Sequence, residues 1–326
     1  MHIVLLLSFL LFFIGNILGQ SSAEVTDDFG YKGNNGPSHW ANSFVYCAGE
    51  LQSPIDIEEN MVKPIRFPPL KFKGFHSVPT LMKLLNNGHT VQLELNSSNR
   101  LPTVSGGPLS GPYAFSQLHF HWGDNDLIGS EDLINNRSFP MELHMVFYKE
   151  EYGSKDNATN HNDGLSVLSV FYEVYDFNNT AYSDIVEHLH LVREPHTSKL
   201  IKIPLTLDDL LPSNKHLYYT YNGSLTTPPC YEVVTWLTFK EPIPLSHFQM
   251  NEFRNLKSQD GELVDNFRPV QPIGNRTIFF NVGERPVHFN QYEDYTNEKQ
   301  KNIGSNYIPS LLLLSLLLLF VSFVIN

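Results

Sequence analysis

The sequence predicts a sheet-rich α+β protein with few helices. Short runs rich in β-branched and aromatic residues recur along the chain, clusters of Gly, Pro and Asn separate them, and helical spacing of apolar residues occurs in only two segments. No internal repeat or low-complexity linker divides the 326 residues. The part between the two apolar ends is therefore within the size of one large domain.

The β-type runs predict strands at residues 90–95, 114–122, 141–148, 164–174, 233–239 and 277–282. Apolar residues recur at intervals of three and four in 181–192 and again around 247–256, which predicts a helix in each segment.

The two ends of the chain are typical of targeting segments. Residues 3–18 form an uncharged apolar run followed by small and polar residues, which indicates a secretory signal peptide over 1–23, with a membrane anchor as the alternative. Residues 308–325 are apolar and stop one residue before the end, and small residues, including Gly304 and Ser305, lie just upstream. We expect a polar stalk over 291–305 and a GPI-attachment signal over 306–326, with a transmembrane helix as the alternative.

Charge and sequons fit an extracellular protein. The formal net charge of −12 argues against binding to nucleic acid or, through the protein surface, to anionic membranes. Six N-x-S/T sequons are present, although sequons also occur by chance; their asparagines are Asn96, Asn136, Asn157, Asn178, Asn222 and Asn275. In an oxidising compartment Cys47 and Cys230 most simply form one disulfide, and two free buried thiols are the alternative.

An H-x-H pattern lies inside one expected strand. Because side chains alternate along a strand, His119 and His121 point to the same face about 7 Å apart, a spacing that lets both bind one metal ion through bonds of about 2 Å. The alternative is a pair of hydrogen-bonded core histidines. His188 and His190 form a second H-x-H, but on a helix two positions are about 200° apart, so those side chains cannot share a metal.

A third candidate ligand, His144, lies in the next expected strand. Glu142 precedes it by two residues and so shares its face. If the two strands are neighbours, three imidazoles meet, and Glu142 can accept a hydrogen bond from the second ring nitrogen of His144. The sequence alone does not establish that the strands are adjacent.

Nine motifs, in order and at similar spacing, make the chain resemble the α-class carbonic anhydrases over about residues 28–290. They are GPSHW (36–40), QSPIDI (52–57), NNGH (86–89), QLHFHWG (117–123), GSE (129–131), ELHMV (142–146), GSLTTPPC (223–230), VTW (234–236) and DNFRPVQP (265–272). The resemblance, of the secreted or GPI-anchored membrane-bound type, implies a catalytic domain over 24–290. It implies a large, mostly antiparallel twisted central sheet with short peripheral helices and Zn²⁺ at the bottom of a conical cleft.

The resemblance also implies the reaction and the residues that carry it out. Zinc held by His119, His121 and His144 would activate water for attack on CO₂, giving bicarbonate and a proton. Thr226 would accept the hydroxide's proton in a hydrogen bond and donate its own to Glu131, and His89 would carry the released proton away.

Further positions of the family map onto the substrate pocket and the surroundings of the ligands. Thr227 would contact bicarbonate. The apolar wall for CO₂ would be Val146, Val167, Leu225, Val234 and Trp236. The residues that orient the ligands or lie near them would be Gln117, Glu142, Asn266 and Tyr31.

The resemblance implies a disulfide between Cys47 and Cys230 and cis peptide bonds at Ser53-Pro54 and Pro228-Pro229. Of the six sequons we expect Asn222 to remain unglycosylated, because a glycan there would stand at the active-site loop. Asp132 stands where a histidine usually follows the GSE glutamate, and it could alter the setting of Glu131.

The sequence therefore predicts a zinc enzyme held by a GPI anchor at the extracellular face of the plasma membrane, with CO₂ and bicarbonate as substrates and no nucleic-acid partner. One alternative is a non-catalytic cell-surface binding module, but such relatives typically lose a zinc ligand. The other is a zinc esterase, but the residues of the apolar pocket are not enlarged or replaced.

Overall fold

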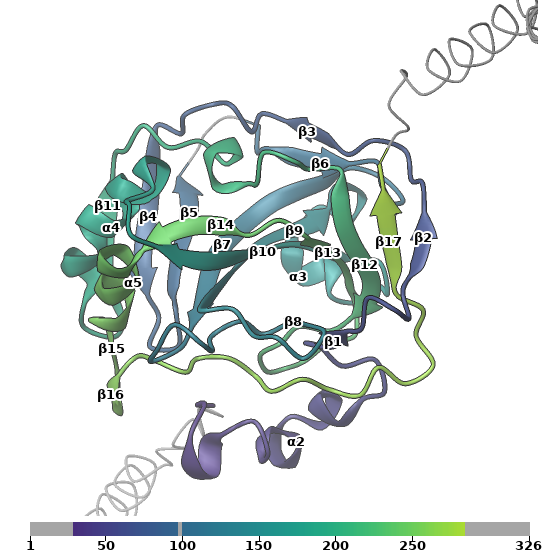
Figure 1. The fold of residues 1–326 in the computed structure, drawn as a ribbon, viewed down its shortest axis with the longest axis horizontal. Helices are drawn as coiled ribbons and strands as arrows, with labels where there is room; N and C mark the ends of the chain where they lie inside the picture. Colours follow the sequence, from purple (N-terminus) through teal and green to yellow (C-terminus); the bar gives the residue numbers. More distant parts are fainter. Residues whose placement is uncertain (1–28, 97–99, 284–326) are drawn as a thin grey trace, which may run out of the picture. The chain divides into compact units, whose positions relative to one another are not determined.

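The computed structural model describes residues 29–96 and 100–283 (Figure 1). The expected signal peptide, stalk and GPI-attachment signal, with Gly304 and Ser305, lie outside these residues. Within them, no helix has the length and apolar character needed to cross a bilayer.

The strands are β1 (Asp56–Ile57), β2 (Lys63–Ile65), β3 (Lys71–Lys73), β4 (Leu81–Asn86), β5 (Val91–Asn96), β6 (Thr103–Ser105), β7 (Tyr113–Trp122), β8 (Leu133–Ile134), β9 (Met141–Lys149), β10 (Leu165–Tyr175), β11 (Thr197–Ile201), β12 (Leu217–Gly223), β13 (Val234–Phe239), β14 (Ile243–Ser246), β15 (Lys257–Ser258), β16 (Gly261–Glu262) and β17 (Phe279–Val282). The α-helices are α2 (Trp40–Ser43), α3 (Lys155–Ala158), α4 (Ser183–Leu189) and α5 (His247–Arg254), and the 3₁₀ turns are η1 (Gly33–Asn35), η2 (Val45–Ala48), η3 (Glu150–Tyr152), η4 (Thr180–Tyr182), η5 (His190–Val192) and η6 (Asp208–Leu210).

One large sheet organises the domain. Its 13 strands include the path β11-β4-β5-β7-β9-β10-β13-β12-β17-β2, with β3, β6 and β14 joined beside it. Most neighbouring strands are antiparallel, and β10–β13, β10–β14 and β17–β2 are the parallel pairs of this sheet. The helices are short, and α4 and α5 lie side by side near β4 and β11 (Figure 1). The predicted single-domain α+β fold with a mostly antiparallel sheet and short helices is confirmed.

The six predicted strands correspond to β5, β7, β9, β10, β13 and β17, and the two predicted helices to α4 and α5. A capping box starts α5: the Ser246 side chain accepts from the backbone N–H of Gln249, and the Gln249 side chain accepts from the backbone N–H of Ser246. The periodicity did not predict β4 or β12, which lie in the sequences LMKLLN and LYYTYNG.

The two faces of the central strands have different roles. On β9, Leu143 and Met145 belong to the main hydrophobic core, whereas the alternate residues, including His144, face the other side of the sheet. On β7 the register shifts between Phe115 and Gln117, so that Phe115 packs in the core before the shift and the even-numbered residues do so after it. This β-bulge sets the face to which the side chains of residues 117, 119 and 121 point.

The remaining backbone expectations are confirmed. Cys47 and Cys230 form a disulfide across a sequence separation of 183 residues. The bonds Ser53-Pro54 and Pro228-Pro229 are both cis. The disulfide links the segment after α2 to the loop that carries Thr226 and Thr227.

Candidate metal centre

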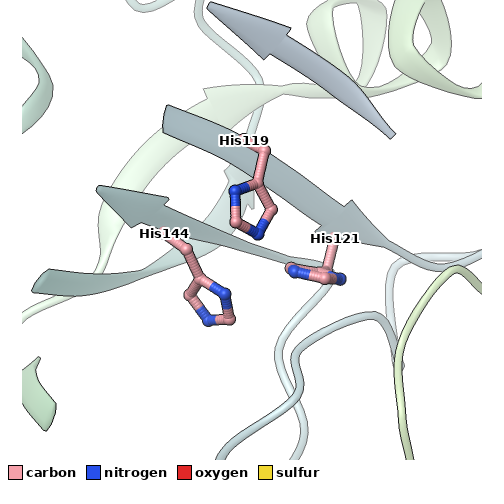
Figure 2. A group of neighbouring side chains, drawn as sticks. All are labelled: His119, His121 and His144. Atoms are coloured by element: carbon pink, nitrogen blue, oxygen red, sulfur yellow. The ribbon is translucent and has the colours of Figure 1, made fainter. Parts of the chain in front are cut away.

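Three histidines converge on the face of β7 and β9 opposite the main core (Figure 2). The two strands are antiparallel neighbours, and His119 lies directly opposite His144. One ring nitrogen from each of His119, His121 and His144 lies within 4.8 Å of the other two. Among the described residues no other group of three or more His, Cys, Asp or Glu side chains meets this criterion. His188 and His190 each hydrogen bond through Nδ1 to a carbonyl oxygen of their own turn, and neither belongs to this group of ligand candidates.

A hydrogen bond orients each imidazole through its other nitrogen. Nδ1 of His119 lies 2.9 Å from Oε1 of Gln117, Nδ1 of His121 lies 2.7 Å from the carbonyl oxygen of Asn266, and Nε2 of His144 lies 2.8 Å from Oε1 of Glu142. All three partners are acceptors, so each oriented nitrogen carries the proton. The lone pairs of His119 Nε2, His121 Nε2 and His144 Nδ1 are therefore left for a metal.

The environment keeps these imidazoles neutral. Burial is the largest cause that lowers the pKa of His119, followed by the repulsion that a protonated His119 would feel from His121, His144 and Lys155. Burial, followed by the charge of His144, also lowers the pKa of His121. Burial alone lowers the pKa of His144 to about 3. Three neutral nitrogen ligands leave the full charge on a bound metal ion, which is the condition under which zinc acidifies water.

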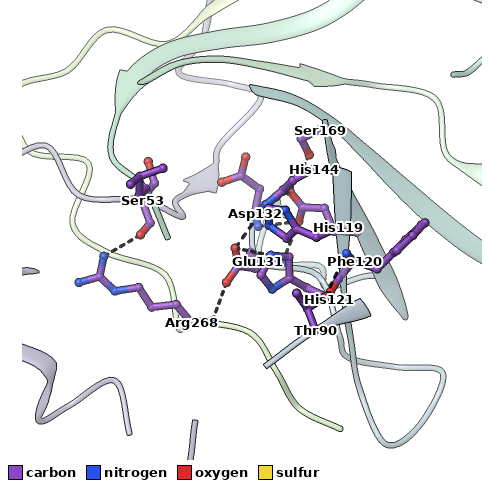
Figure 3. Close-up of polar contacts among 12 residues, drawn as sticks. Ser53, Thr90, His119, Phe120, His121, Glu131, Asp132, His144, Ser169 and Arg268 are labelled. Atoms are coloured by element: carbon purple, nitrogen blue, oxygen red, sulfur yellow. Dashed lines mark hydrogen bonds and ion pairs between the residues drawn. The ribbon is translucent and has the colours of Figure 1, made fainter. Parts of the chain in front are cut away.

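Glu131 lies beside the ligands and is completely buried (Figure 3). Its Oε1 accepts a hydrogen bond of 2.8 Å from the backbone N–H of Arg268. Its Oε2 lies 3.4 Å from Nε2 of His121 and 3.8 Å from Nδ1 of His144. Burial raises the pKa of Glu131, and interactions with the Arg268 backbone and the Thr226 hydroxyl oppose that rise. The Thr226 hydroxyl thus acts on the pKa of this carboxyl group, and the hydrogen bond between the two side chains stays a prediction.

A glycine turn sets the position of Glu131. Gly129 has a φ of +150°, and a Cβ atom there would lie 2.1 Å from the carbonyl oxygen of Pro140. The backbone N–H groups of Glu131 and Asp132 then both donate to Oε2 of Glu142, at 2.8 and 2.9 Å. One buried carboxylate thus holds both His144 and the turn that carries Glu131.

Asp132 belongs to the same buried region. Its Oδ1 accepts from the backbone N–H of Ile55 and the hydroxyl of Tyr221, and its Oδ2 accepts from Thr238. Burial, followed by the charge of Glu142, raises the pKa of Asp132 to about 7, and burial raises that of Glu142 to about 7.

A cavity of about 310 Å³ opens beside His119 and His144. Four of the five expected wall residues line it, namely Val146, Val167, Leu225 and Trp236. Val167 on β10 lies opposite Val146 on β9 and also opposite Trp236 on β13, so the sheet brings these three side chains together. The fifth, Val234, belongs to the same hydrophobic cluster but is not among the residues that line the cavity. Gln117, Thr226 and Thr227 also line it.

His89 and Tyr31 line a separate cavity of about 500 Å³. The ring of His89 stacks on Phe29 with a centroid distance of 4.1 Å, and its carbonyl oxygen accepts a hydrogen bond from Nδ2 of Asn266. The carbonyl of Asn266 in turn orients His121. Burial and the negative charge of Glu131 raise the pKa of Tyr31. Both residues thus lie around the histidine centre without lining the smaller cavity.

The donor set fits a zinc ion. Nε2 of His121 and Oε2 of Glu131 are buried and lack a hydrogen-bond partner among the described residues, so the centre has polar atoms that a metal and its water would satisfy. Imidazole nitrogens in this number are typical of catalytic zinc, which keeps a fourth position open.

The motifs did not reveal three residues that support or adjoin the site. Ser169 lies opposite His144 on β10 and donates to Oε1 of Glu142 (Figure 3). The buried Arg268 guanidinium donates to Gln52, Ser53 and Cys47 while its backbone N–H holds Glu131. Lys155, on α3, lines the smaller cavity. Strand register could have indicated Ser169, and the DNFRPVQP motif contains Arg268, but no pattern in the sequence singled out Lys155.

Comparison with known proteins decides the family. The family model of the eukaryotic-type carbonic anhydrase matches residues 35–282. The chain belongs to this family. Carbonic anhydrase 7 of Mus musculus is 40% identical over 257 residues, which cover 77% of this chain and 96% of that protein. The Homo sapiens carbonic anhydrase 7 is 39% identical over 257 residues, with the same two coverages. Carbonic anhydrase 6 of Canis lupus familiaris is 35% identical over 269 residues, covering 80% of this chain and 82% of that protein.

As a carbonic anhydrase, the protein is an enzyme that uses zinc, and its three convergent histidines are the group in the described residues that can bind it. Because every ring is fixed by a separate acceptor, the geometry of the centre is set before a metal arrives.

Proposed function

We propose that this carbonic anhydrase catalyses the reversible hydration of CO₂ to bicarbonate and a proton at the extracellular cell surface. The observation that carries the proposal is the convergence of three neutral imidazole nitrogens within 4.8 Å of one another, beside a largely apolar cavity. Zinc held by His119, His121 and His144 supplies a Lewis acid that lowers the pKa of bound water to about 7.

Thr226 and Glu131 orient the attacking water. If the Thr226 hydroxyl donates its proton to the Glu131 carboxylate, only its lone pairs remain for the water, so the water must donate to Thr226. A water lone pair is then directed toward the cavity and the substrate. Glu131 can hold this role because the N–H of Arg268 fixes its other oxygen.

The cavity suits a small apolar substrate. CO₂ needs no hydrogen-bond donor, and Val146, Val167, Leu225 and Trp236 provide an apolar wall next to His144. In this proposal Thr227, which lines the same cavity, contacts the bicarbonate product.

The proton leaves through His89. An imidazole is the side chain whose ordinary pKa, about 6.5, suits exchange with buffer near neutrality. The backbone of His89 is joined to Asn266, which orients His121, and its ring faces a cavity large enough for water. A chain of water molecules would connect the two cavities.

The termini would deliver and anchor the enzyme. In this proposal residues 1–23 are a removed signal peptide, 24–290 the catalytic domain, 291–305 a stalk, and 306–326 a GPI signal processed near Gly304 or Ser305. Phospholipase specific for phosphatidylinositol should release the protein from cells expressing the full chain. A protein that stays in the membrane fraction with residues 308–325 intact would instead have a transmembrane helix.

The sequons support the same location. Asn136, Asn157, Asn178 and Asn275 are exposed in the structure and can carry glycans. The side chain of the remaining candidate, Asn96, lies outside the described residues.

Stopped-flow CO₂ hydration tests the reaction. The protein, purified from cells expressing the full chain, should hydrate CO₂, lose activity with a zinc chelator and regain it with added zinc. His144→Ala should abolish activity and lower the zinc content, whereas the control His188→Ala, on α4, should change neither. Zinc-loaded protein without hydration activity would refute the proposal.

A further inference from the structure

The largely apolar wall of the cavity beside the zinc ligands includes one lysine. Lys155 lines it together with His119, His144, Thr226 and Thr227. Asp156 is the only carboxylate among the lining residues of this cavity, and it does not form an ion pair with Lys155. In the described parts of the chain, the Lys155 ammonium group has no hydrogen-bond or ion-pair partner.

The position of Lys155 is well defined. It begins α3, a single turn that the side chain of Ser154 caps by accepting from the N–H of Asn157. Ala158, at the end of the turn, is completely buried in the cluster that also contains Val146 and Val167. The helix therefore holds Lys155 against the cavity, where the lysine is half-buried.

An unpaired cation at such a site attracts anions. Because Lys155 is half-buried at the cavity wall, water screens its charge less than that of a fully exposed lysine. Its field reaches the ligand His119, on which it acts electrostatically. The cation does not favour CO₂, which is neutral, but it favours any monoanion that enters the cavity.

We propose that Lys155 makes this cavity an anion-binding subsite for carboxylate-type monoanions. That bicarbonate is the natural ligand rests on the function proposed above. Lys155 attracts the anion as it enters and stabilises it in the cavity, while Asp156 weakens this effect because it lines the same cavity with the opposite charge.

Equilibrium binding of acetate and of its neutral isostere acetamide tests the subsite. Line broadening of ¹³C-labelled ligand is measured with full-length, zinc-loaded protein at pH 7.5, and zinc content is checked for each variant. Lys155→Gln should raise the Kd of acetate about 3- to 10-fold, between the effects of an exposed and a desolvated ion pair. Lys155→Arg should keep the Kd of acetate within twofold of the wild-type value, and Asp156→Asn should lower this Kd. Acetamide binding should not change.

Ionic strength provides a second readout. The difference between wild type and Lys155→Gln should shrink at 1 M salt, where the screening length is about 3 Å. The inference is wrong if the acetate Kd of Lys155→Gln stays within twofold, or if acetamide is affected as much as acetate. CO₂ hydration is measured separately on the same samples. Protein that binds acetate through Lys155 without hydrating CO₂ would refute the proposed function and leave the subsite standing.

Discussion

Glu142→Gln should weaken zinc binding although Glu142 is not a ligand. The carboxylate is completely buried and accepts four hydrogen bonds, from Nε2 of His144, from Ser169 and from the N–H groups of Glu131 and Asp132. His144 and Ser169 share Oε1, and the two backbone N–H groups share Oε2. A glutamine has one acceptor oxygen and one NH₂ group, so it can accept from only one of these two pairs. If its oxygen keeps the backbone pair, His144 loses the acceptor that orients its ring.

The size of the effect follows from this loss. Removing such a partner of a metal ligand costs about 10- to 100-fold in affinity, or about 1.4 to 2.7 kcal/mol. An unsatisfied buried donor adds about 1 to 3 kcal/mol of destabilisation to the fold, with or without metal. The two effects can be separated because the first appears in the zinc Kd and the second in urea unfolding of the metal-free protein.

Competition with a chromophoric chelator at pH 7.5 measures the zinc Kd. The control is Glu173→Gln, which removes a carboxylate paired with Arg137 at the surface and should leave the Kd unchanged. Zinc affinity within threefold of wild type in Glu142→Gln would refute the argument that this carboxylate sets the ligand geometry.

The other predictions concern the proton path, the surface and the glycans. His89→Ala should keep its zinc but slow turnover about 10- to 100-fold in dilute buffer, with recovery in imidazole buffer; no recovery would mean that another group carries the proton. His144→Ala should lose zinc, and imidazole should not rescue it. Hydrogen bonds, first from Lys149, lower the pKa of Asp163 from 3.8 to about 2, so its stabilisation is present above pH 3.8 and is lost as the pH falls through about 2. Urea unfolding should therefore show that Asp163→Asn lowers the free energy of unfolding by about 1 kcal/mol at pH 7 and by less at pH 3. The value at pH 7 is already reduced because the Asp163 side chain is 41% exposed. Asn222 should carry no sugar in glycopeptide mass spectra of active protein, and a glycan there would contradict the mapping of the loop.

The sequence predicted the histidine centre because its information is local. Two histidines separated by one residue on a strand must share a face, and Glu142 must share the face of His144. Only the adjacency of β7 and β9 was missing, and the register that places His119 opposite His144 supplies it.

Other features could not be predicted because they depend on contacts between distant segments. The bulge between Phe115 and Gln117 changes the face to which the following residues point, and no residue type in that stretch marks it. Val234 was expected in the cavity wall, but it does not line the cavity although it shares the face of Trp236 on β13, a difference that periodicity cannot show.

Asp132 shows how the structure limits what an unusual residue can change. Its carboxylate receives hydrogen bonds from Ile55, Tyr221 and Thr238, which belong to three separate segments, and none of these bonds involves Glu131. The Asp132 charge adds to the effect of burial in raising the pKa of Glu131, but the geometry of Glu131 depends on backbone N–H groups. Those of residues 131 and 132 bind Glu142, and that of Arg268 binds Glu131 itself. Backbone donors are the same whichever side chain occupies position 132. The turn that presents Glu131 to Thr226 can therefore keep its geometry with an aspartate there, provided that the aspartate's own three donors remain in place.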